Sequence, residues 1–169
     1  MKLTVDLNAG ASGLPGEING LTGAIPLGKI VVVASRYNAA VCDALASAAV
    51  ETLLNAGVNP DHVEVVRVPG AWELPLAVSQ AFTHPDTIAA IALGVVIRGD
   101  TSHDEHINRA VSMALMQLGL ESKKPVGFGL LTCYAPEQAL ARAGGSVGNK
   151  GIEAAEAIIE MLRLGANTR

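Results

Sequence analysis

Polar and aromatic residues suited to binding a small molecule gather in four short segments, each of which follows an apolar stretch typical of a β-strand. The four segments are Arg36–Asn38, Pro69–Glu73, Arg98–His103 and Cys133–Pro136. In an open parallel sheet, ligands bind beyond the carboxyl ends of the strands. We therefore expect the functional site in these segments.

Aromatic residues are scarce, and their positions are suited to a slot for a flat ring. The chain has one Trp, two Tyr and two Phe; Tyr37 and Trp72 fall in these segments, with Phe128 on the expected fourth strand nearby. Aromatic faces stack well on heteroaromatic rings. The alternative, that these rings only cover the hydrophobic core, is equally compatible with the sequence.

The segment Gly99-Asp100-Thr101-Ser102 leads into an expected helix and could bind phosphate. It offers free backbone N–H groups, hydroxyls and the positive end of a helix dipole. A Thr or Ser before a helix is more often an N-cap alone, and Asp100 would repel an anion. A phosphate site here therefore needs a cation from elsewhere in the chain.

His103 stands at the start of the same helix, where an imidazole is suited to proton transfer near neutral pH. An exposed histidine without a role is the alternative. His106 follows three residues later, but no second cluster supplies further metal ligands at a recognisable spacing, so we expect no metal site. The chain also lacks glycine fingerprints for dinucleotides or ATP and a Gly-x-Ser-x-Gly elbow.

The elements that must position these residues alternate between strand and helix. Strands are predicted at Lys29–Ser35, Val63–Val68, Thr87–Ile97 and Val126–Thr132. Helices are predicted from Asn38, as N-cap, through Ala56, and at Glu73–Phe82, His103–Leu120, Pro136–Ala143 and Asn149–Leu164. Gly57, Gly119 and Gly144 are expected to end helices. This alternation predicts an α/β fold with a parallel sheet.

Length and composition indicate one α/β domain, residues 29–169, after an irregular leader, residues 1–28. Within the leader, Leu3, Val5 and Leu7 alternate as in a strand that pairs outside the core, and a neighbouring subunit could supply its partner strand. Half of the residues are apolar and 17% are charged, so some apolar surface is expected to be buried against copies of the chain.

Charge and cysteine content exclude several classes of partner. The net charge is −4 and the Lys and Arg residues are scattered, so no nucleic-acid partner is expected. Cys42 and Cys133 are expected to be reduced, buried thiols. The N-terminus lacks the apolar run of a signal peptide or membrane span, which predicts a cytoplasmic protein without a membrane partner.

Several segments, in this order, resemble those of the lumazine synthase family. They are Ser35-Arg36-Tyr37-Asn38, Val68-Pro69-Gly70-Ala71-Trp72-Glu73, Ala92 to Gly99, Gly99-Asp100-Thr101-Ser102-His103, Glu137-Gln138-Ala139-Leu140 before Arg142, and Gly148-Asn149-Lys150-Gly151. Together they span about residues 29 to 164. The resemblance implies a flavodoxin-like three-layer sandwich, with a central parallel sheet flanked by helices.

The resemblance also implies an activity in riboflavin biosynthesis. Members condense 5-amino-6-(D-ribitylamino)uracil with 3,4-dihydroxy-2-butanone 4-phosphate to 6,7-dimethyl-8-ribityllumazine, phosphate and water, and require neither a metal nor another cofactor. His103 corresponds to the family's proton-transfer histidine. The implied substrate-binding residues are Tyr37, Ala71, Trp72, Glu73, Val95, Val96, Ile97, Gly99, Asp100, Thr101, Phe128 and Arg142.

Within that set, the resemblance implies that Tyr37 stacks on the pyrimidine and that Arg142 supplies the missing cation at the phosphate. Phe128 would reach the ring from a neighbouring subunit. Two residues depart from the family pattern, because Asp104 replaces an aromatic residue and Ser146 stands where many relatives carry Lys. We expect these changes to alter affinity and pH optimum more than the reaction.

Family members form pentamers, which stay alone or close into an icosahedral capsid. Those that stay alone often carry extra residues between the last two helices, and the stretch from Gly144 to Gly148 shows no insertion, which favours the shell. Two alternatives to a lumazine-forming enzyme stay open. One is a non-catalytic, shell-forming relative that binds flavin or lumazine, and the other is a different phosphosugar enzyme on the same kind of fold.

Overall fold

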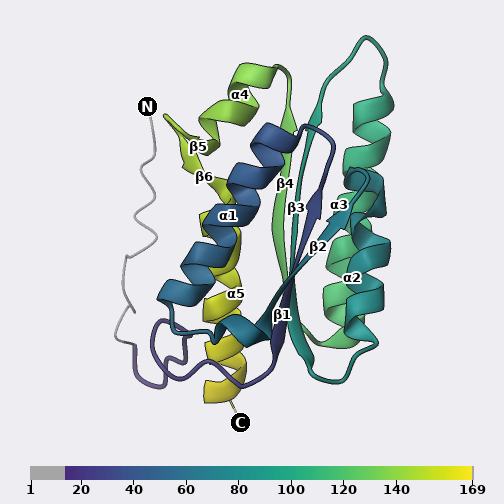
Figure 1. The fold of residues 1–169 in the computed structure, drawn as a ribbon. Coiled ribbons are helices and arrows are strands. Elements are labelled where there is room, and N and C mark those ends of the chain that lie inside the picture. The colour runs from purple at the N-terminus through teal and green to yellow at the C-terminus, as the bar shows by residue number, and fades with distance from the viewer. Residues whose placement is uncertain (1–13, 169) are drawn as a thin grey trace.

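The computed structural model describes residues 14–168 and arranges them in three layers (Figure 1). The central layer is a parallel sheet in the order β2-β1-β3-β4. Its strands are β1 (Lys29–Ser35), β2 (Val63–Val68), β3 (Thr87–Ile97) and β4 (Val126–Cys133). Since all four run in one direction, their carboxyl ends meet at a single edge.

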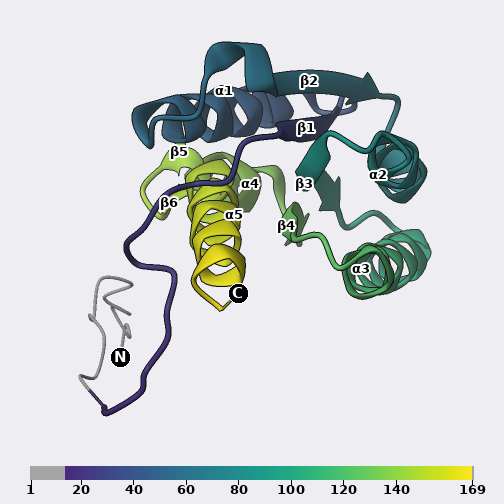
Figure 2. The same ribbon diagram turned by 90° about the horizontal axis from the view of Figure 1, so that it is seen from below.

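Helices cover both faces of this sheet (Figure 2). On one face lie α1 (Ala39–Asn55) and α5 (Lys150–Asn167), and on the other lie α2 (Leu74–Phe82) and α3 (His103–Ser122). The remaining elements are α4 (Pro136–Ala141), the hairpin of β5 (Ala143–Gly145) and β6 (Gly148–Asn149), and the 3-10 helices η1 (Pro60–His62) and η2 (Ala71–Glu73). The predicted α/β sandwich is thus confirmed, whereas the hairpin was not predicted.

Two hydrophobic clusters, one on each face, fix the strands. Ile30 and Val32 of β1 pack with α1 and α5, whereas Val31 and Val33 pack with α2 and α3. Successive strand residues point to opposite faces, so a strand covered on both sides needs apolar residues throughout. This requirement explains why apolar runs in the sequence predict the strands.

Two of the three predicted helix-ending glycines were assigned wrongly. Gly57, with φ of 92°, follows α1 as expected. Gly119 lies inside α3, which continues to Ser122, because packing against β4 outweighs the low helix propensity of a single glycine. Gly144 belongs to β5, since α4 already ends at Ala141.

The Gly148-to-Gly151 segment joins α5 to α1. The Asn149 side chain accepts a hydrogen bond from the Gly151 N–H at 2.8 Å and donates one to the Ala44 carbonyl at 3.3 Å. A Cβ on Gly151 would lie 2.1 Å from the Leu45 carbonyl oxygen. Asn149 and Gly151 therefore allow two helices to approach closely and fix the start of α5.

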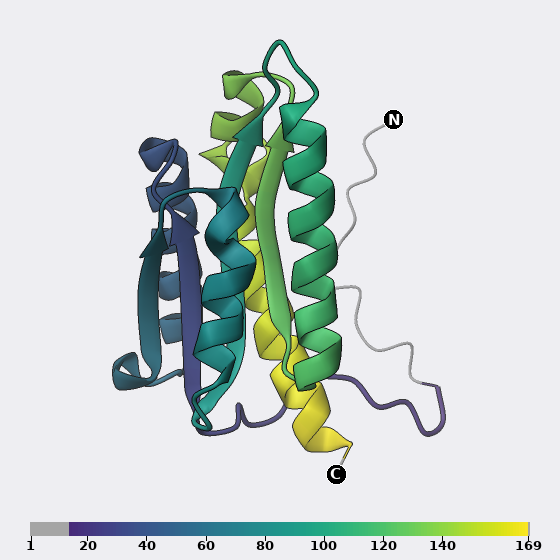
Figure 3. The same ribbon diagram turned by 90° about the vertical axis from the view of Figure 1, so that its right-hand side faces the viewer.

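The described part of the leader, residues 14–28, forms neither helix nor strand and crosses beneath α5 (Figure 3). The Asn167 side chain donates to the carbonyls of Asn19 at 2.9 Å and Thr22 at 3.2 Å. A Cβ on Gly20 would lie 1.9 Å from the Glu160 carbonyl oxygen, so only glycine fits there. The strand predicted around Leu3 to Leu7 lies outside the described residues.

Candidate active site

The loops that follow β1 and β2 are bonded to each other. The Arg36 N–H donates to the Val68 carbonyl at 2.8 Å, and the Tyr37 N–H donates to the Pro69 carbonyl at 3.1 Å. Asn38 occupies the N-cap of α1, but its side chain makes no capping bond; its backbone instead adopts the left-handed conformation, with φ of 57°. This turn leaves the Tyr37 side chain 71% exposed beyond the sheet edge.

The turn carrying Trp72 closes on itself through Glu73, whose Oε2 accepts the Gly70 N–H at 2.9 Å. Glu73 therefore ends η2, and α2 begins one residue later, at Leu74. The prediction that Glu73 begins this helix is wrong. Ala71 is buried, and η2 contacts both β3 and α3, whereas the Trp72 side chain is 60% exposed. The turn thus brings Trp72 to the same edge as the β3–α3 loop.

The loop between β3 and α3 presents unpaired backbone donors. Within the described residues, no N–H from Gly99 to Asp104 donates a hydrogen bond, and Ser102 makes no side-chain cap. A 20-residue helix begins directly after this loop, so its positive dipole end adds to the field of these N–H groups. With the exposed hydroxyl of Thr101, the loop can hold an anion in the way expected from its sequence.

His103 is the first residue of α3 and is exposed beside this loop. Asp104 follows it, and the Oδ1 atom of Asp104 is buried without a hydrogen-bond partner in the described chain. His106 is also exposed. Across residues 14–168, no group of three or more His, Cys, Asp and Glu lies close enough to hold a metal ion.

Two arginines stand near the carboxyl end of β4. Arg142 caps the C-terminus of α4, and its guanidinium donates to the Gln138 carbonyl at 3.1 Å. Arg98, which the sequence analysis did not select, donates its N–H to the Cys133 carbonyl at 2.8 Å and holds its guanidinium 5.8 Å from the Tyr134 ring centroid. Burial raises the pKa of the Cys133 thiol, and the charge of Arg142 opposes that rise.

Phe128 does not lie at this edge in its own chain. It precedes Cys133 by five residues, a distance of about 17 Å along the strand. The idea that Phe128 stands near Tyr37 and Trp72 within one chain is therefore wrong. Phe128 instead lines a small cavity that also includes Lys150, a cation absent from the sequence-based site and paired with Glu153.

The end of β3 contributes three apolar residues of the expected site. Val95 is 3% exposed and packs in the core between β3, α1 and α5, so its side chain does not face the edge. Val96 and Ile97 are half-buried at the end of the strand. Val96 and Ile97 are therefore more accessible to a ligand than Val95.

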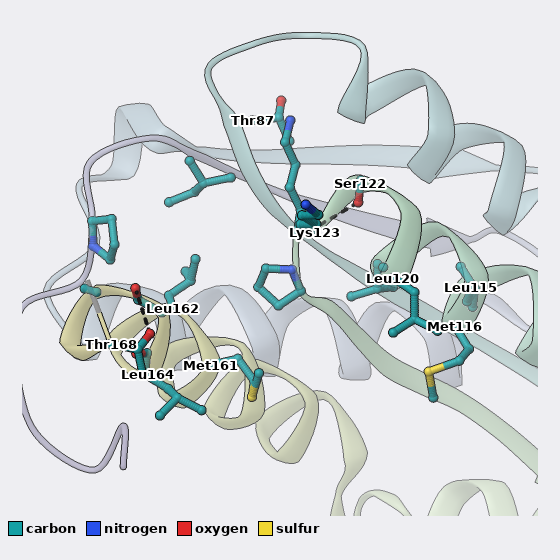
Figure 4. Close-up of a pocket in the computed structure, with 18 of the residues that line it drawn as sticks. Thr87, Leu115, Met116, Leu120, Ser122, Lys123, Met161, Leu162, Leu164 and Thr168 are labelled. Carbon is teal, nitrogen blue, oxygen red and sulfur yellow. Dashed lines mark hydrogen bonds between the residues drawn. The ribbon is translucent and has the colours of Figure 1, made fainter. Parts of the chain in front are cut away.

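A hollow of about 1570 Å³ lies at the opposite end of the sheet (Figure 4). It is an open apolar groove between the C-terminal halves of α3 and α5. Its exposed apolar residues include Leu27, Met116, Leu120 and Met161, with Phe128 also in its wall. None of the loops that carry Tyr37, Trp72 or His103 contributes to it, so the groove is separate from the candidate site.

No helix among residues 14–168 combines the length and apolarity needed to cross a membrane. The order of the four parallel strands defines a flavodoxin-like α/β protein, and the polar loops at their carboxyl ends form its candidate small-molecule site.

Comparisons with known proteins refine this class. Residues 28–166 match the family model described as 6,7-dimethyl-8-ribityllumazine synthase. A protein of that name from Rhodopirellula baltica is 57% identical over 153 residues, which cover 90% of this chain and 99% of the relative. One from Gemmatimonas aurantiaca is 48% identical over 80% of this chain and 83% of its own length, and one from Aquifex aeolicus is 44% identical over 79% and 86%. The chain belongs to the 6,7-dimethyl-8-ribityllumazine synthase family.

Proposed function

We propose that the protein is a transferase of riboflavin biosynthesis that condenses 5-amino-6-(D-ribitylamino)uracil with 3,4-dihydroxy-2-butanone 4-phosphate, giving 6,7-dimethyl-8-ribityllumazine, phosphate and water. Family membership supports the reaction. The observation that carries it to this chain is the row of unpaired N–H groups from Gly99 to Asp104, which stands beside His103 at the edge that also presents Tyr37 and Trp72.

The chemistry suits a site without a strong nucleophile. An amine of the pyrimidine adds to the ketone and expels a first water to form an imine, loss of phosphate leaves an enol, and ring closure expels a second water. Each step moves protons, which an imidazole such as that of His103 can do near neutral pH. Positioning of the two substrates supplies the rest of the rate enhancement.

The geometry of the edge supports the following substrate positions. The pyrimidine stacks on the exposed ring of Tyr37, and its polar edge and ribityl chain meet the turn at Trp72 and Glu73. The phosphate binds at the N-terminus of α3, where backbone donors and Thr101 face the anion. Arg142 supplies the positive charge that offsets Asp100.

We also propose that the site is shared between subunits of a pentamer, and that pentamers close into an icosahedral shell. In one chain, Arg142 follows α4 on the α1 side of the sheet, whereas His103 begins α3 on the other side (Figure 2). Phe128 stands about 17 Å along β4 from its own loops, so it can reach a ring only in a neighbour's site. The apolar groove beside β4 offers surface for that contact. A cytoplasmic location accords with two free thiols.

Incubation of the purified protein with both substrates tests the reaction. We expect lumazine fluorescence and inorganic phosphate to appear together in equal amounts, and neither to appear quickly when the butanone lacks its phosphate. Binding of lumazine or flavin without turnover would support the non-catalytic relative instead. Phosphate release without lumazine would support another phosphosugar enzyme.

A further inference from the structure

Buried groups hold the backbone of Tyr37 on both sides, although its ring is exposed. The Tyr37 N–H donates to the Ser35 hydroxyl at 3.1 Å and to the Pro69 carbonyl at 3.1 Å. The Tyr37 carbonyl accepts the Cys42 thiol proton at 3.2 Å and lies 3.5 Å from the Ser35 hydroxyl. Ser35 is 1% exposed and Cys42 is fully buried.

The hydrogen bond from the Cys42 thiol matters because no backbone N–H of α1 donates to the Tyr37 carbonyl. The N–H groups of Val41 and Cys42, in the first turn of α1, donate to the Asn38 carbonyl instead. Asn38 is left-handed, a conformation that Asn adopts more readily than most L-residues. Without Cys42, the Tyr37 carbonyl would keep only the long contact to Ser35.

The thiol is in the protonation state that this bond needs. Burial raises the pKa of Cys42, an effect larger than the opposing influences of Ser35 and Arg67. The thiol therefore stays protonated at neutral pH and can donate its proton continuously.

We propose that Cys42 is a positioning residue for substrate binding, because its thiol, with Ser35, fixes the peptide from which the stacking ring of Tyr37 projects. The inference rests on the proposed function, in which that ring binds the pyrimidine. A fixed loop has less conformational entropy to lose when the pyrimidine binds. Cys42 thus acts on pyrimidine affinity through Tyr37, without touching either substrate.

A purely structural cysteine makes a different prediction. Cys42 also packs in the core beside Ala34 and Leu45, so it could serve only to fill space. In that case Cys42→Ser, which buries a stronger polar group, should be at least as harmful as Cys42→Ala. A hydrogen-bonding role predicts the opposite order, since Ser keeps the donor.

The test compares Cys42→Ala, Cys42→Ser and, as a matched control, Thr52→Ala, which removes another side-chain hydrogen bond of α1, the one to the Ala48 carbonyl, without touching Tyr37. Hydrogen–deuterium exchange of the peptide covering residues 35–41 is measured with steady-state kinetics on each assembled protein. In Cys42→Ala we expect faster exchange and a KM for the pyrimidine raised roughly three- to tenfold, with little change in kcat. Cys42→Ser should restore both values, and Thr52→Ala should alter neither.

Three results would overturn the proposal. Unchanged exchange in Cys42→Ala means that the thiol does not hold the loop. Faster exchange with an unchanged pyrimidine KM means that the loop does not serve the pyrimidine. Equal damage from Ala and Ser means that packing is the role. A wild-type protein that makes no lumazine instead contradicts the proposed function, and the exchange measurement still decides whether Cys42 holds the loop.

Discussion

His103 stands where α3 begins, exposed beside the loop that is proposed to bind phosphate, and we expect it to transfer protons. His103→Ala should lower kcat by roughly 10²–10⁴-fold with little change in substrate binding, because the positioning residues stay in place. Residual activity should remain, since amines condense with ketones unaided. Stopped-flow or steady-state fluorescence of lumazine gives the rate.

His106→Ala is the matched control for that change, because His106 is also exposed on the first turn of α3. Its kcat should stay near the wild-type value. Equal losses in the two variants, or none in His103→Ala, would remove His103 from the mechanism.

Arg142 is expected to act on the phosphorylated substrate. Arg142→Ala should raise the KM for the butanone phosphate at least tenfold, because an anion loses a charge-assisted partner, which is typically worth about 1.5–3 kcal/mol. The KM for the pyrimidine should change much less. Arg109→Ala, at an exposed position of α3, serves as a control for the loss of one positive charge. A rise confined to the pyrimidine KM would place the phosphate elsewhere.

At the scale of the elements, the close approach of α5 to α1 depends on Gly151. Gly151→Ala should destabilise the protein by about 1–3 kcal/mol, because a Cβ there meets the Leu45 carbonyl and forces the helices apart. Melting temperatures at equal protein concentration measure the loss. Glu156→Ala, at an exposed position of the same helix, should stay within about 0.5 kcal/mol of the wild type. Equal stabilities of the two variants would show that the helices adjust without cost.

Elements with a strong hydrophobic pattern could be predicted from the sequence, whereas some helix ends could not. All four strands agree with the structure to within one residue, because the strands covered on both faces are apolar runs and β2, at the edge of the sheet, is rich in Val. Gly119 failed as a helix end, since the packing of α3 on β4 is not visible in local propensity. The site loops are predicted from topology. Arg98, although it begins one of these loops, and Lys150 were not selected as site residues, because only folding brings them near Tyr134 and Phe128.

At the scale of the whole molecule, a site shared between subunits makes a test by complementation possible. Alone, His103→Ala subunits turn over slowly, and Arg142→Ala subunits do so when the butanone phosphate is kept far below their raised KM. Under that condition the two should regain activity when they are unfolded, mixed in equal amounts and refolded together. Random mixing gives about a quarter of the interfaces both intact residues, so about a quarter of the wild-type activity should return.

If each site belongs to a single chain, every mixed site still carries one defect and no activity returns. Light scattering on the same samples reports the particle size. A pentamer-sized particle would contradict the icosahedral shell, and an active monomer would contradict the shared site itself.

The bonds from Asn167 to the leader carry a practical consequence for protein engineering. They hold residues 19–22 against the last turn of α5, at the end of the sheet opposite the carboxyl ends of its strands (Figure 1). A tag or fluorescent fusion partner attached after residue 168 would therefore emerge far from the loops that are proposed to bind substrate. The same bonds make the last turn of α5 a poor place to truncate, because removal of Asn167 releases the leader for proteolytic cleavage.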